Sequence, residues 1–203
     1  MTRAGRFITL EGGEGSGKST QARLLADRLR AKGHEVVLTR EPGGTPGAEA
    51  IRSLLVTGDP DRWTAWSEAL LMTAARVDHV TRIIRPALAR GAWVICDRFI
   101  DSTRAYQGAG GGLPDAALTA LHDQAVDLWP DRTLVLLLDE AEGLARAASR
   151  GNAEARFEAL GSDFHARVQR FFAELPARDP RRCQAIPASG SIDDVAERIM
   201  AAL

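Results

Sequence analysis

Short, uninterrupted runs of apolar residues alternate along the chain with longer segments in which apolar residues recur every three or four positions. The short runs predict strands, and they lie at Phe7–Leu10, Val36–Leu38, Trp93–Asp97, Leu134–Leu138 and Cys183–Ile186. Continuous apolar runs are typical of strands buried on both faces, and strands that alternate with helices are typical of a parallel sheet. The pattern therefore predicts an α/β fold in which helices cover both faces of a five-stranded parallel sheet.

The helical spacing predicts which of the intervening segments are helices. One helix follows the first strand and ends at Lys32, and the others cover about 48–55, 61–90, 99–106, 114–129, 139–150, 164–175 and 192–203. Pro86 is expected to kink the long helix. The glycines of 108–112 are expected to form a flexible turn, and Ser191 is expected to cap the last helix, with Asp194 at its third position.

A glycine-rich stretch separates the first strand from the first helix. It fits the phosphate-loop pattern G-x-x-x-x-G-K-[ST], and its residues are Gly12, Gly13, Glu14, Gly15, Ser16, Gly17, Lys18, Ser19 and Thr20. Backbone N–H groups can wrap a triphosphate only where residues without a Cβ atom let the chain approach closely. Lys18 is expected to reach the β- and γ-phosphates of ATP, and the Ser19 hydroxyl to ligate Mg²⁺. A plain glycine turn is the alternative, but it leaves Lys18 unexplained, because only two of the 26 basic residues are lysines.

The third predicted strand ends in the charged pair Asp97-Arg98. Ligands of open parallel sheets bind beyond the carboxyl ends of the strands. Asp97 is therefore expected to complete the Mg²⁺ site, and Arg98 to clamp a second phosphate with its two-pronged guanidinium group. A simple ion pair at the strand end is the structural alternative. Arg40 follows the second strand at the same edge, where it fits either a solvated arginine or a ligand-binding one.

Three further arginines, Arg146, Arg150 and Arg156, flank Gly151. The number alone proves little in an arginine-rich chain. Arg146 and Arg150, however, share one helical face. That spacing would suit a lid that brings positive charge to a phosphoryl group in transfer.

The bulk composition limits the class of protein. The 203 residues favour a single domain over 1–203, and a net charge of −1 argues against a partner such as nucleic acid. Two cysteines, Cys96 and Cys183, are too few for a disulfide framework or a zinc site and are expected to be reduced thiols. No stretch approaches the ~18 apolar residues of a membrane-spanning helix. We therefore expect a cytoplasmic protein without a membrane partner.

Several stretches together resemble bacterial thymidylate kinase: Glu11-Gly12 with Glu14 and the phosphate loop, Thr39–Thr45, Ala74–Arg76, Asp97–Phe99 and Ser102–Gly108. The resemblance continues in register from about Phe7 to the last helix. It implies a phosphate-loop fold of the nucleoside monophosphate kinase type, with a short lid at about 140–158. The implied reaction transfers the γ-phosphoryl group of ATP to dTMP with the help of Mg²⁺, which yields dTDP and ADP in dTTP biosynthesis.

The resemblance also implies which residues bind dTMP. It assigns Arg40 and Arg98 to the phosphate, Glu14 and Tyr106 to the sugar, Arg76, Gln107 and Met72 to the thymine, and Ser102 to the same site. Met72 stands where the family commonly has an aromatic residue, and a thioether makes a softer contact with a pyrimidine face. Ala155 stands where the family often has an aspartate, which removes one lid salt bridge.

The resemblance is greatest to one branch of the family. Gly15 replaces a loop arginine of the other branch, so the catalytic arginines would come from the lid, as Arg146, Arg150 and Arg156. The family usually forms homodimers through long helices, and the helix over 63–84 would serve, although a stripe that faces the core has the same pattern.

Two other functions compete with this interpretation. Another nucleoside monophosphate or small-metabolite kinase would share the phosphate loop, but Arg76 and Tyr106-Gln107-Gly108 argue against it. A GTP-dependent switch or binding module would usually carry an N-K-x-D motif, which the sequence lacks. A purely structural role leaves the coincidence of two phosphate-binding strand ends unexplained.

Overall fold

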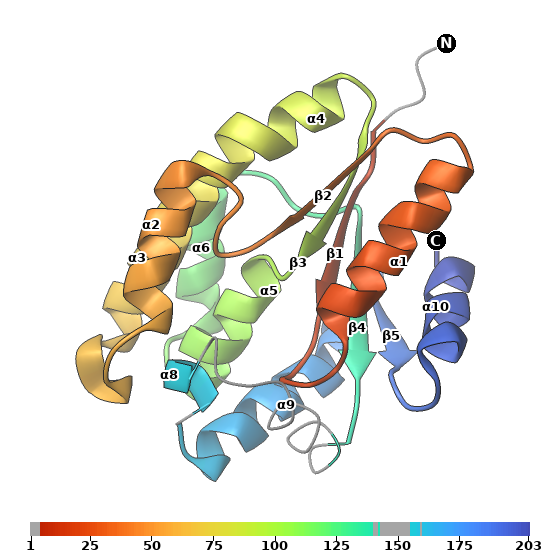
Figure 1. Ribbon diagram of the computed structural model, residues 1–203. Coiled ribbons are helices and arrows are strands. Elements are labelled where there is room, and N and C mark those ends of the chain that lie inside the picture. Colours follow the sequence, from red (N-terminus) through yellow and green to blue (C-terminus); the bar gives the residue numbers. More distant parts are fainter. Residues whose placement is uncertain (1–4, 140–141, 143–154, 159) are drawn as a thin grey trace.

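The computed structural model describes residues 5–139, 142, 155–158 and 160–203 (Figure 1). Within them, five parallel strands form one sheet in the order β2-β3-β1-β4-β5. The strands are β1 (Phe7–Glu11), β2 (Val36–Arg40), β3 (Trp93–Asp97), β4 (Arg132–Leu137) and β5 (Cys183–Pro187). The predicted five-stranded parallel sheet is confirmed, and the predicted strands differ from the observed ones only at their ends.

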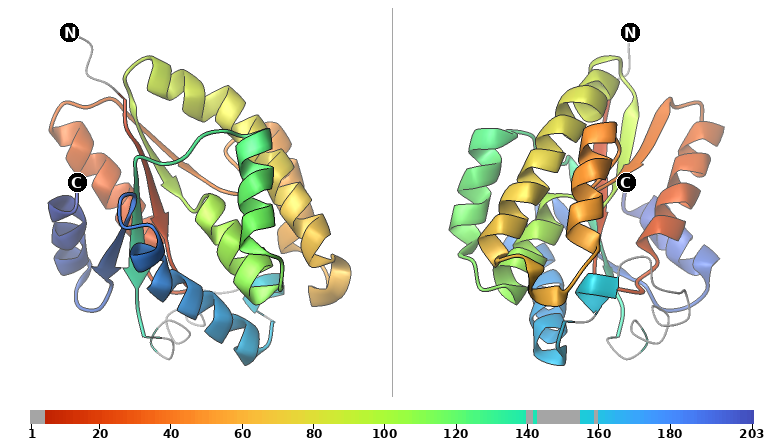
Figure 2. Two further views of the ribbon diagram at one scale, coloured as in Figure 1. Left: turned by 180° about the vertical axis from the view of Figure 1, so that it is seen from behind. Right: turned by 60° about the vertical axis from the view of Figure 1, so that its left-hand side comes forward.

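Helices cover both faces of the sheet, as Figures 1 and 2 show. One face is covered by α1 (Lys18–Ala31) and α10 (Ile192–Ala201), whose apolar residues pack against Ile8 and Leu10 of β1. The other face is covered by the remaining helices, which include α3 (Ala65–His79), α6 (Asp115–Ala125) and α9 (Ser162–Arg178). Phe7 of β1 belongs to the apolar cluster on that second face. Successive residues of β1 are thus buried on opposite sides, which explains the uninterrupted apolar run.

The strand register aligns the carboxyl ends that carry the charged residues. Leu10 of β1 lies beside Asp97 of β3, and Arg40 of β2 lies on the other side of the same Asp97. The loop that follows β1 therefore leaves the sheet beside the ends of β2 and β3. Parallel pairing alone brings these residues, which are far apart in sequence, to one edge.

The predicted helix over 61–90 is wrong in two respects. A separate 3-10 turn, η1 (Pro60–Arg62), precedes it, and the Thr64 hydroxyl caps α3 by accepting the Ser67 N–H at 3.2 Å. Near its end the helix passes through a π-helical turn, η2 (Val80–Ile84), into α4 (Arg85–Ala89). Pro86 has no N–H group and so cannot donate the usual helix hydrogen bond. The wider π-helical turn just before it accommodates this loss. The preceding α2 (Pro46–Val56) starts earlier than expected, at a Thr45 cap followed by proline.

The expected flexible glycine turn over 108–112 is wrong for its first part, because 108–110 are helical and only Gly111 and Gly112 form an exposed turn. The short α5 (Ile100–Thr103) continues into a π-helical segment, η3 (Arg104–Gly110), which packs against α9. Gly110 is buried, and a Cβ atom added to it would lie 2.5 Å from the Phe164 ring. Gly110 therefore allows close helix packing instead of providing flexibility.

Some of the remaining predictions are confirmed, and others concern segments outside the described residues. Ser191 and Asp194 form a complete capping box on α10, as expected, and Cys96 and Cys183 are both free and buried. Asp139 accepts the Glu142 N–H at 3.4 Å. Most of the predicted helix over 139–150 and of the predicted lid lies outside the described residues, which resume with α8 (Ala155–Glu158).

The substitution Gly110→Ala tests this packing. We expect it to destabilise the protein by about 1–3 kcal/mol, because the added methyl group overpacks the contact with Phe164. In a flexible turn the same substitution would instead stabilise by about 0.4–1 kcal/mol. Urea unfolding therefore separates the two descriptions by sign. Gly161→Ala, at a site with open space around the added atom, is the control and should change stability by less than about 1 kcal/mol.

Candidate active site

The loop between β1 and α1 has the backbone geometry that a phosphate cradle needs. Gly12, Gly15 and Gly17 adopt positive φ angles of 142°, 69° and 88°. A Cβ atom on Gly12 would lie 2.4 Å from the Leu136 carbonyl oxygen, so only glycine fits there. Gly17 immediately precedes α1, and the N-terminus of that helix directs its free N–H groups and positive dipole end toward the loop.

Lys18 is folded against this loop. Its ammonium group donates to the Gly13 carbonyl oxygen at 2.7 Å and to the Ser16 hydroxyl at 3.1 Å. Burial and the nearby guanidinium group of Arg98 lower the pKa of Lys18 to about 8. The side chain is thus held, with little solvent contact, where the backbone bends around the expected phosphates.

Ser19 and Asp97 lie beside the loop as predicted. The Ser19 hydroxyl donates a short hydrogen bond to the Asp97 carboxylate, which ends β3. A hydroxyl and a carboxylate are oxygen donors of the kind that Mg²⁺ prefers, and Mg²⁺ sites in phosphoryl-transfer enzymes typically combine one or two protein ligands with substrate phosphates. Among the described residues, no group of three or more His, Cys, Asp or Glu side chains could hold a metal ion without such help.

Arg98 contacts both the phosphate loop and the residues that follow β3. Its backbone has a φ of 69°, which is uncommon for a residue other than glycine and is often found at functional sites. Its guanidinium group donates to the Gly12 carbonyl oxygen at 3.2 Å and to the Ser102 hydroxyl at 3.1 Å. The other amino group donates to Glu14 at 3.0 Å and to the Tyr106 hydroxyl at 3.2 Å. Arg98 therefore connects the phosphate loop directly to the helix that follows β3.

Glu14 and Tyr106 complete this cluster. The Tyr106 hydroxyl donates to Glu14 at 2.6 Å. Burial alone would raise the pKa of Glu14, but Arg98, Lys18 and the tyrosine hydroxyl outweigh burial and lower it to about 2. Burial also raises the pKa of Tyr106 well above 10. At neutral pH the cluster therefore consists of a carboxylate, a neutral phenol and two cations.

Glu11, whose role the sequence leaves open, holds the residues next to this cluster in place. Its carboxylate accepts the Phe99 N–H at 2.7 Å and the Ser102 hydroxyl at 2.6 Å. These two bonds hold the start of α5 in place, because Phe99 directly precedes this helix and Ser102 lies within it. Burial, followed by repulsion from Asp101, raises the pKa of Glu11 to about 8.

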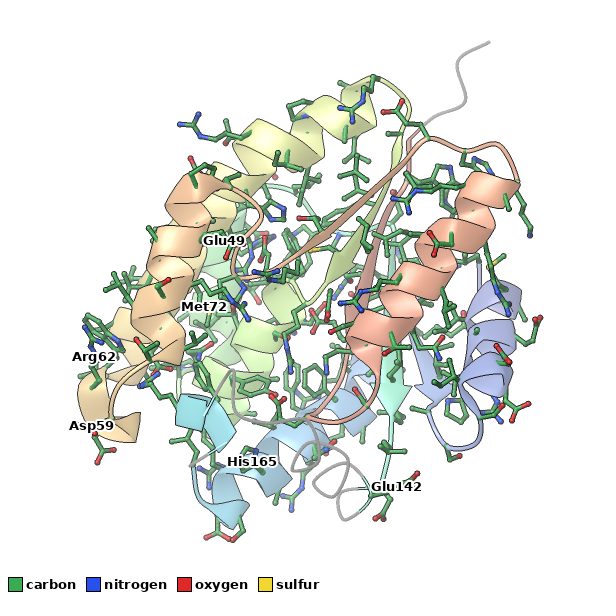
Figure 3. All side chains as sticks on the ribbon, in the orientation of Figure 1. Glu49, Asp59, Arg62, Met72, Glu142 and His165 are labelled. Carbon is green, nitrogen blue, oxygen red and sulfur yellow. The ribbon has the colours of Figure 1, made fainter. Side chains whose placement is uncertain are left out.

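A pocket opens next to Arg98 and leads away from the phosphate loop. Its lining includes most of the predicted dTMP-binding residues: Glu14, Met72, Arg76, Arg98, Ser102, Tyr106 and Gln107. Met72 projects from α3, and Figure 3 shows where it lies on that helix. The structure thus brings together residues from the loop, α3, α5 and η3 around one cavity.

Arg76 is held in the pocket wall by residues that the sequence analysis did not single out. It donates to Glu41 at 2.7 Å and to the Thr103 hydroxyl at 3.0 Å. Glu41 is bonded in turn to His79 at 3.0 Å, and His79 to the Thr39 hydroxyl at 2.7 Å. Arg76 is 2% exposed, and its Nη1 atom has no hydrogen-bond partner among the described residues. An unpartnered buried donor is costly unless something pairs with it, so Nη1 marks a place for an acceptor atom.

The other predicted site residues lie outside this pocket lining. Arg40 is half-exposed and pairs with Glu49 at 3.0 Å. Arg156 is buried and forms an ion pair with Glu68. Arg146 and Arg150 lie outside the described residues.

A second cavity adjoins the phosphate loop on the side of α10. It is lined by Ser16, Gly17, Thr20 and Gln21 from the loop and α1, and by Ala188, Gly190, Ser191, Ile192 and Val195 from the β5–α10 connection. The sequence analysis did not predict the contribution of this connection. Gln21 also donates to the Ile192 carbonyl oxygen at 2.9 Å, which ties the two sides of the cavity together.

Local sequence could have revealed only part of what was missed. Glu41 lies within the stretch Thr39–Thr45, so a buried role for it was within reach. The pairing of His79 with this stretch and the pairing of Thr103 with Arg76 depend on how α3 and α5 pack, and no spacing in the sequence indicates them.

The chain is similar to thymidylate kinases over almost its whole length. The family model described as thymidylate kinase matches residues 10–199. A curated thymidylate kinase of Caulobacter vibrioides is 56% identical over 196 residues, which cover 96% of this chain and 94% of that protein. One of Rhizorhabdus wittichii is 53% identical over 201 residues, which cover 98% and 97%. A crystal structure of thymidylate kinase from Ehrlichia chaffeensis matches with a TM-score of 0.80 and 35% identity, and the match covers 98% of both chains.

The pKa of Glu11 leads to a testable pH dependence of stability. The folded protein holds this proton up to about pH 8, whereas an unfolded glutamate loses it near pH 4.3. Between these values the folded state binds more protons, so Glu11 makes stability fall as pH rises. The variant Glu11→Gln keeps an acceptor oxygen but has no proton to lose. We therefore expect its stability to fall less steeply with rising pH than that of the wild type.

Urea unfolding at pH 5 and pH 8 measures the difference. Relative to the wild type, the variant should gain about 1.4 kcal/mol or more between the two values, which corresponds to one pKa unit. An identical pH slope for both proteins would show that Glu11 is ionised in the folded state at neutral pH.

Proposed function

Given that this chain belongs to the thymidylate kinase family and transfers the γ-phosphoryl group of ATP to dTMP, which yields dTDP and ADP for dTTP synthesis, we propose how its residues divide that reaction. Its phosphate-loop fold is of the nucleoside monophosphate kinase type, with a five-stranded parallel sheet between helices. The single observation that carries the assignment is the bond from Arg98 to the Gly12 carbonyl oxygen, at 3.2 Å. Through this bond Arg98, the cation proposed to bind the dTMP phosphate, contacts the loop proposed to bind ATP.

The residues from Gly12 to Thr20 hold the phosphates of ATP. Backbone N–H groups of the loop and the first turn of α1 surround the β- and γ-phosphates, and Lys18 leaves the Gly13 carbonyl to contact them. The cavity toward the β5–α10 connection then receives the nucleoside part of ATP. Phosphoryl transfer needs charge neutralisation and positioning more than a protein nucleophile, because the dTMP phosphate oxygen attacks.

Ser19 and Asp97 hold Mg²⁺. Their side chains already meet beside the loop and offer oxygen ligands. When bound, the ion neutralises charge that develops on the phosphates.

The acceptor phosphate lies at Arg98, with Ser102 beside it. The guanidinium group contacts Ser102, Glu14 and Tyr106 and so is fixed in direction before dTMP binds. Glu14 faces the 3′-hydroxyl of the sugar, and the Tyr106 ring packs against the deoxyribose, where a 2′-hydroxyl would fit poorly. Arg40 joins this phosphate site by exchanging its exposed partner Glu49 for the anion.

The thymine base lies between Met72 and the wall that carries Arg76 and Gln107. The Nη1 atom of Arg76, which lacks a partner among the described residues, donates to a thymine carbonyl oxygen. Met72 covers one face of the ring with its thioether. In the segment around 140–158, Arg146 and Arg150 supply positive charge to the phosphoryl group in transfer.

The active protein is a homodimer in the cytoplasm, with no nucleic acid or membrane as partner. Trp66, Leu70 and Val77 of α3 are between 37% and 54% exposed, so this part of the predicted stripe does not face the core. Such a run of apolar side chains along one helix is a self-complementary surface for a two-fold contact. None of the described helices is long and apolar enough to cross a membrane.

The substitution Arg98→Ala tests the acceptor site. We expect dTMP phosphorylation to fall by about 10²–10³-fold or more, because the acceptor phosphate loses its positioning cation. ATP should still bind, since Lys18 and the loop glycines remain. Coupled ADP-release kinetics and fluorescent ATP titration measure the two effects. Arg90→Ala, which removes an exposed arginine paired with Glu35, is the control, and unchanged turnover in Arg98→Ala would contradict the assignment.

Base selectivity is tested with a panel of dTMP, dUMP, AMP, GMP and CMP in the ADP-release assay. The wild type should prefer dTMP. The variant Met72→Phe should bind dTMP equally well or more tightly, because an aromatic ring stacks better on a pyrimidine than a thioether does. A marked rise of KM for dTMP in this variant would show that residue 72 does not face the base, and a preference for another monophosphate would overturn the choice of acceptor.

A further inference from the structure

The carboxylate of Glu68 joins two segments of the chain that are far apart in sequence. It accepts a hydrogen bond from the Gln107 amide nitrogen at 2.9 Å, and its other oxygen accepts a short one from Arg156. All three residues are buried, with exposed fractions of 9%, 2% and 3% for Glu68, Gln107 and Arg156. One carboxylate thus links α3, η3 and α8.

Two further bonds of Arg156 are made to the connection between α2 and α3 and to the end of α2. It donates to the Asp59 carbonyl oxygen at 2.9 Å and to the Leu55 carbonyl oxygen at 3.2 Å. Figure 3 shows Asp59 at the tip of the connection between α2 and α3. The planar guanidinium group therefore docks α8 on the end of α2 in a geometry that an ammonium group could not reproduce. A buried carboxylate such as Glu68 needs this pairing, because an uncompensated charge there would be costly.

The docking of α8 places one wall of the acceptor pocket. Phe157 directly follows Arg156 and lines the pocket with Met72 and Gln107. Its ring lies 5.9 Å from the Tyr106 ring in an edge-to-face arrangement. Where Arg156 is anchored therefore decides where the Phe157 ring meets the bound nucleotide.

Glu68 also fixes the direction of the Gln107 amide. An ionised carboxylate only accepts hydrogen bonds, so it holds the amide NH₂ group. The carbonyl oxygen is then the end of the amide that Glu68 does not hold. A hydrogen-bond acceptor at this position suits the N3–H donor of thymine, whereas cytosine has an acceptor at N3.

We propose that Glu68 is a positioning residue for recognition of the acceptor base and that Arg156 acts with it at the base pocket, not on the phosphoryl group in transfer. This inference rests on the proposed function and specifies how its site selects a pyrimidine. Glu68 touches no substrate; it orients Gln107 directly and places Phe157 through Arg156. The sequence-based expectation for Arg156, a lid arginine at the phosphates, is the competing role.

Steady-state kinetics of Glu68→Gln, Arg156→Lys and the double variant test the proposal. A glutamine at 68 can donate to the Gln107 carbonyl and so turn that amide around. We expect KM for dTMP to rise about tenfold in each single variant, the size of one charge-assisted hydrogen bond. KM for ATP should stay unchanged and kcat should stay within about threefold. In Glu68→Gln the preference for dTMP over dCMP should also shrink about tenfold, which a merely structural role would not cause.

Coupling and controls make the test decisive. Because both residues act through one pair, the double variant should be no worse than the more affected single one. Glu174→Gln removes an exposed carboxylate paired with Arg178 on α9 and should change none of these constants. If Glu68→Gln does not fold, Arg156→Lys alone still separates the two roles by the constant that changes.

Three results would overturn the proposal. A loss of kcat in Arg156→Lys with KM for dTMP unchanged would place Arg156 at the phosphoryl group. Additive effects in the double variant would show that the residues act independently. Unchanged KM and unchanged discrimination in Glu68→Gln, with a wild type active on dTMP, would refute this inference and leave the proposed function intact. A wild type inactive on dTMP would refute both.

Discussion

The contacts of Arg98 are the interaction on which the rest of the site depends. This residue follows β3 in a left-handed conformation, and its guanidinium group reaches the Gly12 carbonyl, Glu14 and Ser102 together. Two phosphate-bearing substrates repel each other strongly at short distance unless cations lie between them. Parallel strand register places the end of β3 beside the end of β1, and the backbone turn at Arg98 then directs the cation at the junction. Without either constraint, the proposed donor and acceptor sites would not face each other.

Buried carboxylates supply the rigidity that this arrangement needs. Glu11 fixes the turn under Arg98, Glu41 fixes Arg76, and Glu68 fixes Gln107. Each lies under a side chain assigned to the acceptor nucleotide and is itself 9% exposed or less. A charged group that must meet a ligand in one direction loses less entropy on binding when a partner already holds it. The side chains that line the pocket are therefore held in place by a second layer of buried carboxyl groups behind them.

The sequence predicted those parts of the fold and site that depend on local chemistry. The apolar runs located the five strands of the described sheet, and the phosphate-loop pattern with Asp97-Arg98 predicted a candidate site at the carboxyl edge, where Ser19 and Asp97 meet. Parallel pairing converts such local signals into spatial neighbours by a general rule. Three features followed no such rule. They are the series of buried hydrogen bonds that leads from Thr39 through His79 to Arg76, the π-helical turns, and the ion-pair partner of Arg156. They depend on side-chain packing between distant helices, and a spacing pattern holds no information about it.

The strong bias toward arginine over lysine has a structural reason at this site. Arg76, Arg98 and Arg156 each bond to two or more acceptors in different directions, which a planar fork with five N–H donors allows. Lys18 faces the opposite requirement. Its single ammonium group contacts the Gly13 carbonyl and the Ser16 hydroxyl of one tight loop. A compact charge on a flexible stem suits such a contact, whereas a guanidinium group presents its donors in a wide, fixed fork.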